Sequence, residues 1–156
     1  MPNWPVSNAV APSNIYSMLV PKRVAFTATI TDASQTETSA FRILTITPDA
    51  VAPLVDVEVW LDLAKATTGF AAVESSITAQ FAVARKLDGT NWRREAYNEA
   101  ALSGTNAANR MQKLTVGAVT AEELAAVFAV FSSDVTADIV IPGLVIYKGL
   151  LPPTVA

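Results

Sequence analysis

The sequence contains no histidine and no cysteine, and only 16% of its residues are charged. Without histidine and cysteine, a Ser–His or Cys–His nucleophile pair cannot form, and neither can an imidazole or thiolate metal site or a disulfide bond. The six glycines match neither a phosphate-binding loop nor a dinucleotide fingerprint, and no serine lies in a Gly-x-Ser-x-Gly motif. Carboxylate chemistry is the catalytic candidate that remains.

A strong charge of either sign is also missing. The formal net charge is −3, and the eleven lysines and arginines are scattered along the chain. We therefore expect no nucleic-acid partner. Surfaces of soluble monomers commonly carry about 25–35% charged residues, so the low charge predicts that part of this surface is covered by other subunits or by a larger body. In the alternative, Ser, Thr, Asn and Gln keep the surface hydrated.

Long apolar runs are absent as well. The longest are residues 124–131 and 139–147, and Pro142-Gly143 interrupts the second. Both are much shorter than the ~20 residues that span a bilayer, so we expect no transmembrane helix and no membrane partner. The first residues lack the basic region and the apolar run of a secretory signal, so we expect no signal peptide.

The two ends of the sequence are rich in proline and show no sustained helical or strand period. Proline biases its neighbours to extended geometry, so we expect residues 1–22 to form an extended N-terminal arm and residues 150–156 an extended tail. An ordered extended arm needs a surface to pack against, which is either its own sheet or a neighbouring subunit. Residues 23–149 are expected to form a single β-sandwich domain. The expected assembly contacts of arm and tail are Trp4, Pro5, Ile15, Tyr16, Leu19, Leu151 and Pro152.

Between the ends, alternating apolar and polar residues predict half-buried strands. Residues 24–31 alternate in this way, and residues 41–47 form a β-branched run that stops at Pro48-Asp49. The clearest predicted strand is residues 55–63. Its expected core side chains are Val55, Val57, Val59, Leu61 and Leu63, and those expected on the opposite face are Asp56, Glu58, Trp60 and Asp62.

A hairpin is predicted in the middle of the chain. Residues 77–87 read as a strand, and Asp88-Gly89 supplies two positions with positive φ for a tight turn. The chain then returns through Thr90, Trp92 and Arg94. We expect Ile77, Ala79, Phe81 and Val83 to face the core.

The last third contains a predicted long loop, residues 98–110, and a strand over residues 112–119. The capping box Thr120-Ala121-Glu122-Glu123 predicts one short helical turn near residues 120–125. Residues 126–131 fit either a helix face or a buried strand, and we favour a turn that leads into a strand. Residues 138–147 are apolar on both faces, so they are expected to lie between layers or under a partner, with a bulge or bend at Pro142-Gly143.

About eight strands with little helix predict an all-β fold, an antiparallel β-sandwich. The stretch from Leu114 through Thr120-Ala121-Glu122-Glu123 to the closing strand 139–147 resembles the last third of the jelly rolls of carbohydrate-binding modules and viral proteins. That resemblance implies a jelly-roll-like sandwich.

Three sets of residues are candidate sites. Asp56, Glu58 and Asp62 share one strand face around Trp60, which could hold a glycosidase pair or a calcium ion, although a solvated strand face is the favoured interpretation. We therefore expect no catalytic residue, no cofactor and no metal. Trp60, Trp92 and Tyr97 could instead stack on sugar rings. In the alternative, Trp92 covers the hairpin end and Trp60 lies at a subunit contact.

The third set is the basic hairpin. It could dock on an acidic neighbour, or it could be an ordinary solvated strand end, and both interpretations stay open. The complete candidate docking or glycan surface is Asp56, Glu58, Trp60, Arg85, Trp92, Arg93 and Arg94, and Lys86 belongs to the same hairpin.

The low charge, the abundance of Ala, Thr and Val, the missing Cys and His, the proline-rich arm and the β-sandwich together resemble small virion structural proteins of tailed bacteriophages. The likeness is greatest to decoration (cement) proteins, which sit on capsid surfaces, often as trimers. It implies a virion protein, made in the host cytoplasm, that is not an enzyme. Its implied partners are further copies of itself, with a trimer favoured, and a major capsid protein. The alternative function is a carbohydrate-binding β-sandwich module, with a glycan as partner.

Overall fold

The computed structural model describes residues 18–30, 41–66, 79–95, 98–100, 111–131 and 138–156. These residues are almost entirely strand, apart from a short 3-10 helix, η3 (Leu63–Lys65), and helical backbone at Met18 and Leu19. Within them, no helix has the length and apolar character needed to cross a membrane. The strands are β1 (Lys22–Ile30), β2 (Phe41–Thr47), β3 (Leu54–Asp62), β4 (Ala79–Lys86), β5 (Trp92–Arg94), β6 (Asn98–Ala100), β7 (Met111–Val119), β8 (Ala125–Phe131), β9 (Ile139–Lys148) and β10 (Thr154–Val155).

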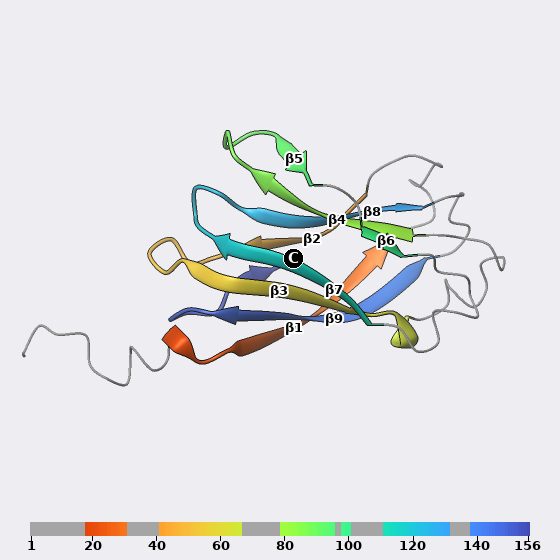
Figure 1. Ribbon diagram of the computed structural model, residues 1–156, viewed down its shortest axis with the longest axis horizontal. Helices are drawn as coiled ribbons and strands as arrows, with labels where there is room; N and C mark the ends of the chain where they lie inside the picture. The colour runs from red at the N-terminus through yellow and green to blue at the C-terminus, as the bar shows by residue number, and fades with distance from the viewer. Residues whose placement is uncertain (1–17, 31–40, 67–78, 96–97, 101–110, 132–137) are drawn as a thin grey trace, which may run out of the picture.

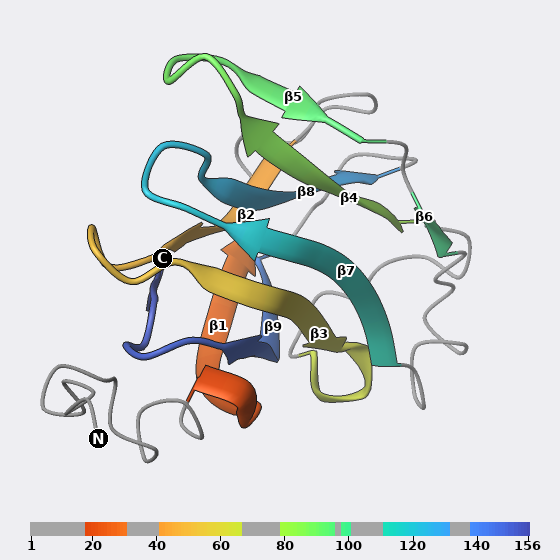
Figure 2. The ribbon, with the colours of Figure 1, turned by 60° about the vertical axis from the view of Figure 1, so that its left-hand side comes forward.

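The strands form two packed sheets, which Figures 1 and 2 show from two directions. Sheet A has the order β1-β9-β3-β7, and sheet B has the order β10-β2-β8-β4-β5, with β6 also paired to β4. The pairs are nested along the chain, because β1 pairs with β9, β2 with β8, β3 with β7 and β4 with β5, all antiparallel. Successive pairs fall alternately in sheet A and sheet B, as in a long hairpin rolled into a jelly roll. The predicted antiparallel, jelly-roll-like β-sandwich is confirmed.

The core lies between the two sheets and follows from strand alternation. Along β9, every second residue from Ile139 to Tyr147 is buried, while the residues between them are half-buried. In β1 the expected inward side chains become more buried along the strand, and Ile30 is fully buried. The largest fully buried side chains include Phe81, Ile30, Ile46, Leu54, Leu61 and Leu114. These side chains form the hydrophobic core that a two-layer sandwich requires between its sheets.

Most predicted strands are present with small changes of boundary. The strand at residues 41–47 has the predicted bounds, and the strand predicted at 112–119 begins one residue earlier. The ambiguous segment 126–131 belongs to strand β8. The prediction of a loop over 98–110 is wrong at its start, because Asn98–Ala100 forms β6, while residues 101–110 lie outside the described residues. Residue 77 also lies outside them.

The predicted core position of Val55 is wrong. Leu54 is fully buried in its place, and the Val55 side chain is 46% exposed. The pairing of β3 with β7 and with β9 shifts register next to Asp56, which has a positive φ of 50°. A β-bulge adds one residue to the strand, so the alternation is interrupted and resumes from Val57. The inward positions at 57, 59, 61 and 63 are confirmed.

The predicted hairpin at residue 88 is present, but the predicted turn type is wrong. Lys86 pairs with Trp92, so five residues connect the strands, and only Gly89 among them has a positive φ, of 72°. The Asp88 carboxylate instead accepts hydrogen bonds from the backbone N–H groups of Thr90 and Asn91, at 3.0 and 2.6 Å. An aspartate that binds the backbone two residues ahead forms a turn in which the aspartate itself needs no left-handed geometry.

The helical turn expected near residues 120–125 is absent, and the chain bends there without a helix. The capping contact itself is present, because the Glu123 N–H donates to Thr120 Oγ1 at 3.0 Å. The Thr120 N–H donates to the Glu123 carbonyl at 3.3 Å, and Ala125 then starts β8. The capping residues therefore close a tight turn between two strands.

The pairing of β1 with β9 contains no bulge at Pro142-Gly143, so the bulge that was one of the two expected outcomes there is absent. The register between β1 and β9 runs without a shift from Lys22 opposite Tyr147 to Ile30 opposite Ile139. The pairing of β3 with β9 ends at Leu61 opposite Gly143. Pro142 therefore lies just beyond the point where β9 loses its second neighbour, which is where a strand tolerates proline.

Candidate functional site

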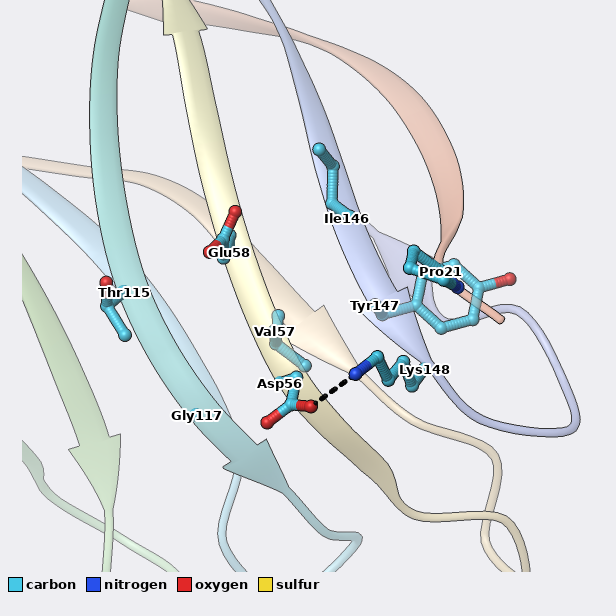
Figure 3. Close-up of a pocket in the computed structure, with 9 residues that line it drawn as sticks. All are labelled: Pro21, Asp56, Val57, Glu58, Thr115, Gly117, Ile146, Tyr147 and Lys148. Carbon is cyan, nitrogen blue, oxygen red and sulfur yellow. Dashed lines mark hydrogen bonds and ion pairs between the residues drawn. The ribbon is translucent and has the colours of Figure 1, made fainter. Parts of the chain in front are cut away.

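A shallow hollow of about 370 Å³ lies on the outer face of sheet A, where β3, β7 and β9 lie side by side (Figure 3). It is placed by the bulge at Asp56 and by Gly117, which lies opposite Val57 and has a φ of 81°. Two neighbouring strands thus depart from regular geometry at the same point. Bulges commonly re-aim side chains near functional sites, so this hollow is a candidate functional site.

The three carboxylates of the predicted acidic face each pair with a lysine. Lys148 Nζ lies 2.8 Å from Asp56 Oδ2 and Lys113 Nζ lies 2.8 Å from Glu58 Oε1. Asp62 Oδ2 is 3.5 Å from Nζ of Lys65, the last residue of η3 and three positions beyond the end of β3. In the described part of the chain, no group of three acidic side chains could hold a metal ion. The carboxylates are arranged as separate ion pairs.

Glu58 has the wrong protonation behaviour for a glycosidase acid. Hydrogen bonds from Lys113 and from the Trp60 indole, whose Nε1 donates to Glu58 Oε2 at 3.1 Å, lower the pKa of Glu58 below its usual range. A general acid at neutral pH needs a raised pKa. Glu58 therefore stays ionised, which favours the interpretation of this face as an ordinary solvated surface.

The two tryptophans of the predicted glycan surface lie on opposite faces of the molecule. Trp60 is on the outer face of sheet A, beside a second hollow of about 230 Å³ lined partly by Met111 and Leu144. Trp92 is in sheet B, with its ring centroid 6.2 Å from that of Phe128 in an edge-to-face arrangement. The third aromatic residue, Tyr97, lies outside the described residues. Trp60 and Trp92 therefore do not line one groove.

Each of these indole rings also carries a cation of the chain itself. Lys113 Nζ is 5.5 Å from the Trp60 centroid. Lys86 Nζ and Arg42 Cζ are 5.6 and 5.8 Å from the Trp92 centroid. Sugar stacking needs an open aromatic face, and these cations compete for it. Arg42 was missed by sequence reasoning, because no local pattern brings β2 beside a tryptophan of β5.

Arg85 lies apart from the other residues of the basic hairpin. Its guanidinium donates hydrogen bonds to the backbone carbonyls of Val116 and Ala118 in β7 and forms an ion pair with Glu123 at 3.7 Å. The side chain is only 15% exposed. Arg85 thus ties sheet B to sheet A. Arg93, which lies opposite Arg85 in β5, is exposed and pairs with Asp88 at 3.7 Å.

The predicted arm contacts Trp4, Pro5, Ile15 and Tyr16 lie outside the described residues. Of the others, Leu19 is 65% exposed, Leu151 is 43% exposed and Pro152 is exposed. The last residues of the tail lie on their own sheet, because Thr45 and Ala156 exchange two backbone hydrogen bonds of 2.6 and 3.1 Å beside β10. The expected contacts of Leu19, Leu151 and Pro152 with a neighbouring subunit stay predictions.

Most of the exposed large apolar side chains in the described residues belong to segments at one end of the sandwich, which is the end drawn at the left in Figure 1. We define the turn end as residues 18–21, 48–53, 87–91, 120–124 and 149–153, together with the strand residues that adjoin them. In the described residues, seven of the eight exposed large apolar side chains lie there, and the eighth, Met111, starts β7 at the opposite end. The seven are Met18, Leu19, Val51, Val55, Leu87, Leu150 and Leu151, with exposed fractions from 43% to 86%.

No protein-family model and no curated protein matches the sequence. Among solved structures, the chain is similar to one reported as "Structure of infectious bursal disease virus Gx strain", with a TM-score of 0.43 and 10% sequence identity. The similarity covers 86% of this chain and 35% of that chain, so the present chain spans about a third of its length. The jelly-roll assignment itself rests on the strand pairing described above.

Proposed function

We propose that this protein is a non-enzymatic structural component of a viral particle, which binds the outer capsid surface and bridges or stabilises neighbouring capsid subunits. The observation that carries the proposal is the turn end. Large apolar side chains that are scattered singly over a surface need no explanation, whereas a cluster of them marks an interaction site. In the described residues, seven of the eight exposed large apolar side chains lie at this one end.

Apolar side chains at the turn end are carried by a fixed strand framework. Leu150 and Leu151 follow β9, and Val55 pairs through the backbone with Lys148 at the end of the same strand. The Lys22 ammonium donates to the Gly149 carbonyl, which holds the start of β1 beside this segment. An apolar patch on a rigid strand framework loses little conformational entropy when a partner covers it.

The polar surface supports a role without catalysis. Each of the three carboxylates on the acidic face of β3 forms an ion pair with a lysine. Because the pKa of Glu58 is lowered, Glu58 does not fit the role of the general acid that sugar cleavage needs. The cations over Trp60 and Trp92 likewise favour docking over sugar stacking.

In this proposal the partners are further copies of the chain, with a trimer favoured, and a major capsid protein. A protein that binds only the assembled shell stabilises it by mass action, and many copies on one shell add avidity. The turn end would supply the apolar contact in either association.

Immunogold electron microscopy of the particles that carry this chain tests the proposal. An antibody raised against the purified chain should label the outer surface of intact capsids. Label that is absent from intact particles, combined with retention of the purified chain on immobilised glycans, would overturn the proposal and support a carbohydrate-binding module instead.

A further inference from the structure

Sheet B carries a second surface, which lies on its outer face and which we call the Trp92 cluster. It consists of Arg42 in β2, Lys86 in β4, Trp92 in β5 and Phe128 in β8. Phe128 pairs through the backbone with Arg42 on one side and Ala82 on the other, while Trp92 pairs with Lys86. Four strands thus bring two cations and two aromatic rings to one place.

The sheet beneath the cluster is lined with alanine. Phe81 and Val83 of β4 point to the core, so Ala82 and Ala84, which alternate with them, point outward, yet these alanines are only 1% and 0% exposed. Ala126 of β8, opposite Ala84, is 0% exposed as well. Small side chains at these positions leave room for the larger rings around them to lie close to the sheet. The cluster is therefore a packed, ordered surface.

The two cations of the cluster differ from those on the other face of the molecule. On the outer face of sheet A, Lys65, Lys113 and Lys148 each have a carboxylate within 4.0 Å. In the described part of the chain, neither Arg42 nor Lys86 has one. Their charges are held instead beside the Trp92 ring, at 5.8 and 5.6 Å from its centroid.

We propose that the Trp92 cluster binds a carboxylate-rich surface of a partner protein. The indole orders both cations, and a guanidinium presents paired donors that match a carboxylate. A pre-ordered cation loses less side-chain entropy when the partner arrives. Because the cations already lie over the ring, a sugar would have to displace them, and two cations neutralise too few phosphates for a nucleic-acid surface on a chain of net charge −3.

The cluster is distinct from the turn end, and its binding is tested on the purified chain without any particle. Failure of this inference therefore leaves the capsid proposal standing, and failure of the capsid proposal leaves this one standing. The probe is poly-L-glutamate at low ionic strength, about 0.05 M, where screening is weak.

Nuclear magnetic resonance of the tryptophan indoles gives an internal control, because the chain has three tryptophans and only one belongs to the cluster. On titration with poly-L-glutamate, the Trp92 indole resonance should shift in a saturable way, and the Trp60 resonance should stay unchanged. The variant W92F assigns the resonance. Addition of salt should reverse the shift.

Two charge-reversal variants complete the experiment. R42E/K86E should weaken poly-L-glutamate binding about tenfold or more. R23E/K65E, which makes the same change in net charge on residues outside sheet B, should leave binding within about twofold, as expected of distant charges screened by salt. Equal losses in both variants, or no shift of Trp92 in the wild type, would overturn the proposal.

Two further outcomes would also overturn the proposal, because each would show that a different ligand binds the Trp92 cluster. Binding of heparin but not of poly-L-glutamate would indicate a sulfated glycan. Loss of self-association in R42E/K86E, measured by sedimentation velocity, together with no binding of poly-L-glutamate, would indicate that a second copy of the chain covers the cluster.

Discussion

The ring of Phe26 lies directly over Gly143, its backbone partner across the β1–β9 ladder. A Cβ atom at position 143 would collide with that ring on one side and with the Trp60 carbonyl oxygen of β3 on the other. Three strands of sheet A therefore approach one another closely at this glycine. An aromatic ring that packs over a cross-strand glycine recovers the contact area that glycine itself lacks.

Replacing Gly143 with alanine should destabilise the fold. Overpacking a well-filled site costs about 1–3 kcal/mol, and here backbone lies on one side and a packed ring on the other. Urea unfolding gives the free energy. Gly149→Ala is the matched control, because its Cβ would meet Leu54 Cδ2 at 3.0 Å and the Pro53 carbonyl oxygen at 3.2 Å, contacts that are less close than those at Gly143, and should cost less. Equal losses in the two variants would show that the close approach at Gly143 is unimportant.

Arg85→Met should lower the free energy of unfolding by roughly 1.5–3 kcal/mol, the range for a hydrogen bond to a charged group, because the carbonyls of Val116 and Ala118 lose their donor. Glu123→Gln removes the other partner of Arg85, in an ion pair whose glutamate is 46% exposed, and should cost only about 0–1 kcal/mol. Urea unfolding of both variants compares the two effects. A larger loss in Glu123→Gln than in Arg85→Met would contradict the bridging role of the guanidinium.

Asp88 predicts a pH dependence of the β4–β5 hairpin. Hydrogen bonds from the Asn91 and Thr90 backbone lower its pKa from 3.8 to about 2. A carboxyl group whose pKa is lower in the folded state stabilises that state above its unfolded pKa, and this contribution disappears as the pH falls from 3.8 to about 2. Carboxyl-detected nuclear magnetic resonance should therefore give a titration midpoint near 2. In Asp88→Asn, the hairpin amides should lose their pH dependence in that window. A midpoint at or above 3.8 would refute the turn geometry.

Strand positions could be predicted where burial follows the simple alternation of a pleated strand. The segment at 41–47 and the inward side chains of β1 and β9 are of this kind. Alternation predicts the wrong face for Val55, because the bulge at Asp56 depends on pairing with β7 and β9, which the pattern along one strand cannot reveal. The turn at Thr120 was placed correctly but given the wrong conformation, since the capping contact of a helix also closes a tight strand connection.

Candidate sites were harder to predict, because they are assembled across strands that are far apart in the sequence. Arg85 and Arg93 are neighbours across the hairpin, yet Arg85 reaches into β7 and Arg93 stays on the surface. Arg42 reaches Trp92 only because β8 and β4 lie between their strands in sheet B. The exposed apolar side chains of the turn end likewise come from four segments that lie far apart in the sequence: Met18 and Leu19, Val51 and Val55, Leu87, and Leu150 and Leu151.

The measurement that tests the central claim most directly is light scattering coupled to size-exclusion chromatography on three proteins. These are the wild type, Leu150→Asn/Leu151→Asn at the turn end, and Met111→Asn, which makes the same kind of change at the exposed apolar side chain of the opposite end. If the turn end drives association, the wild type and Met111→Asn should both have the mass of an oligomer, with a trimer expected. Leu150→Asn/Leu151→Asn should shift toward the monomer mass of 16.5 kDa. A monomeric wild type, or an oligomer that Met111→Asn disrupts and Leu150→Asn/Leu151→Asn does not, would contradict the account.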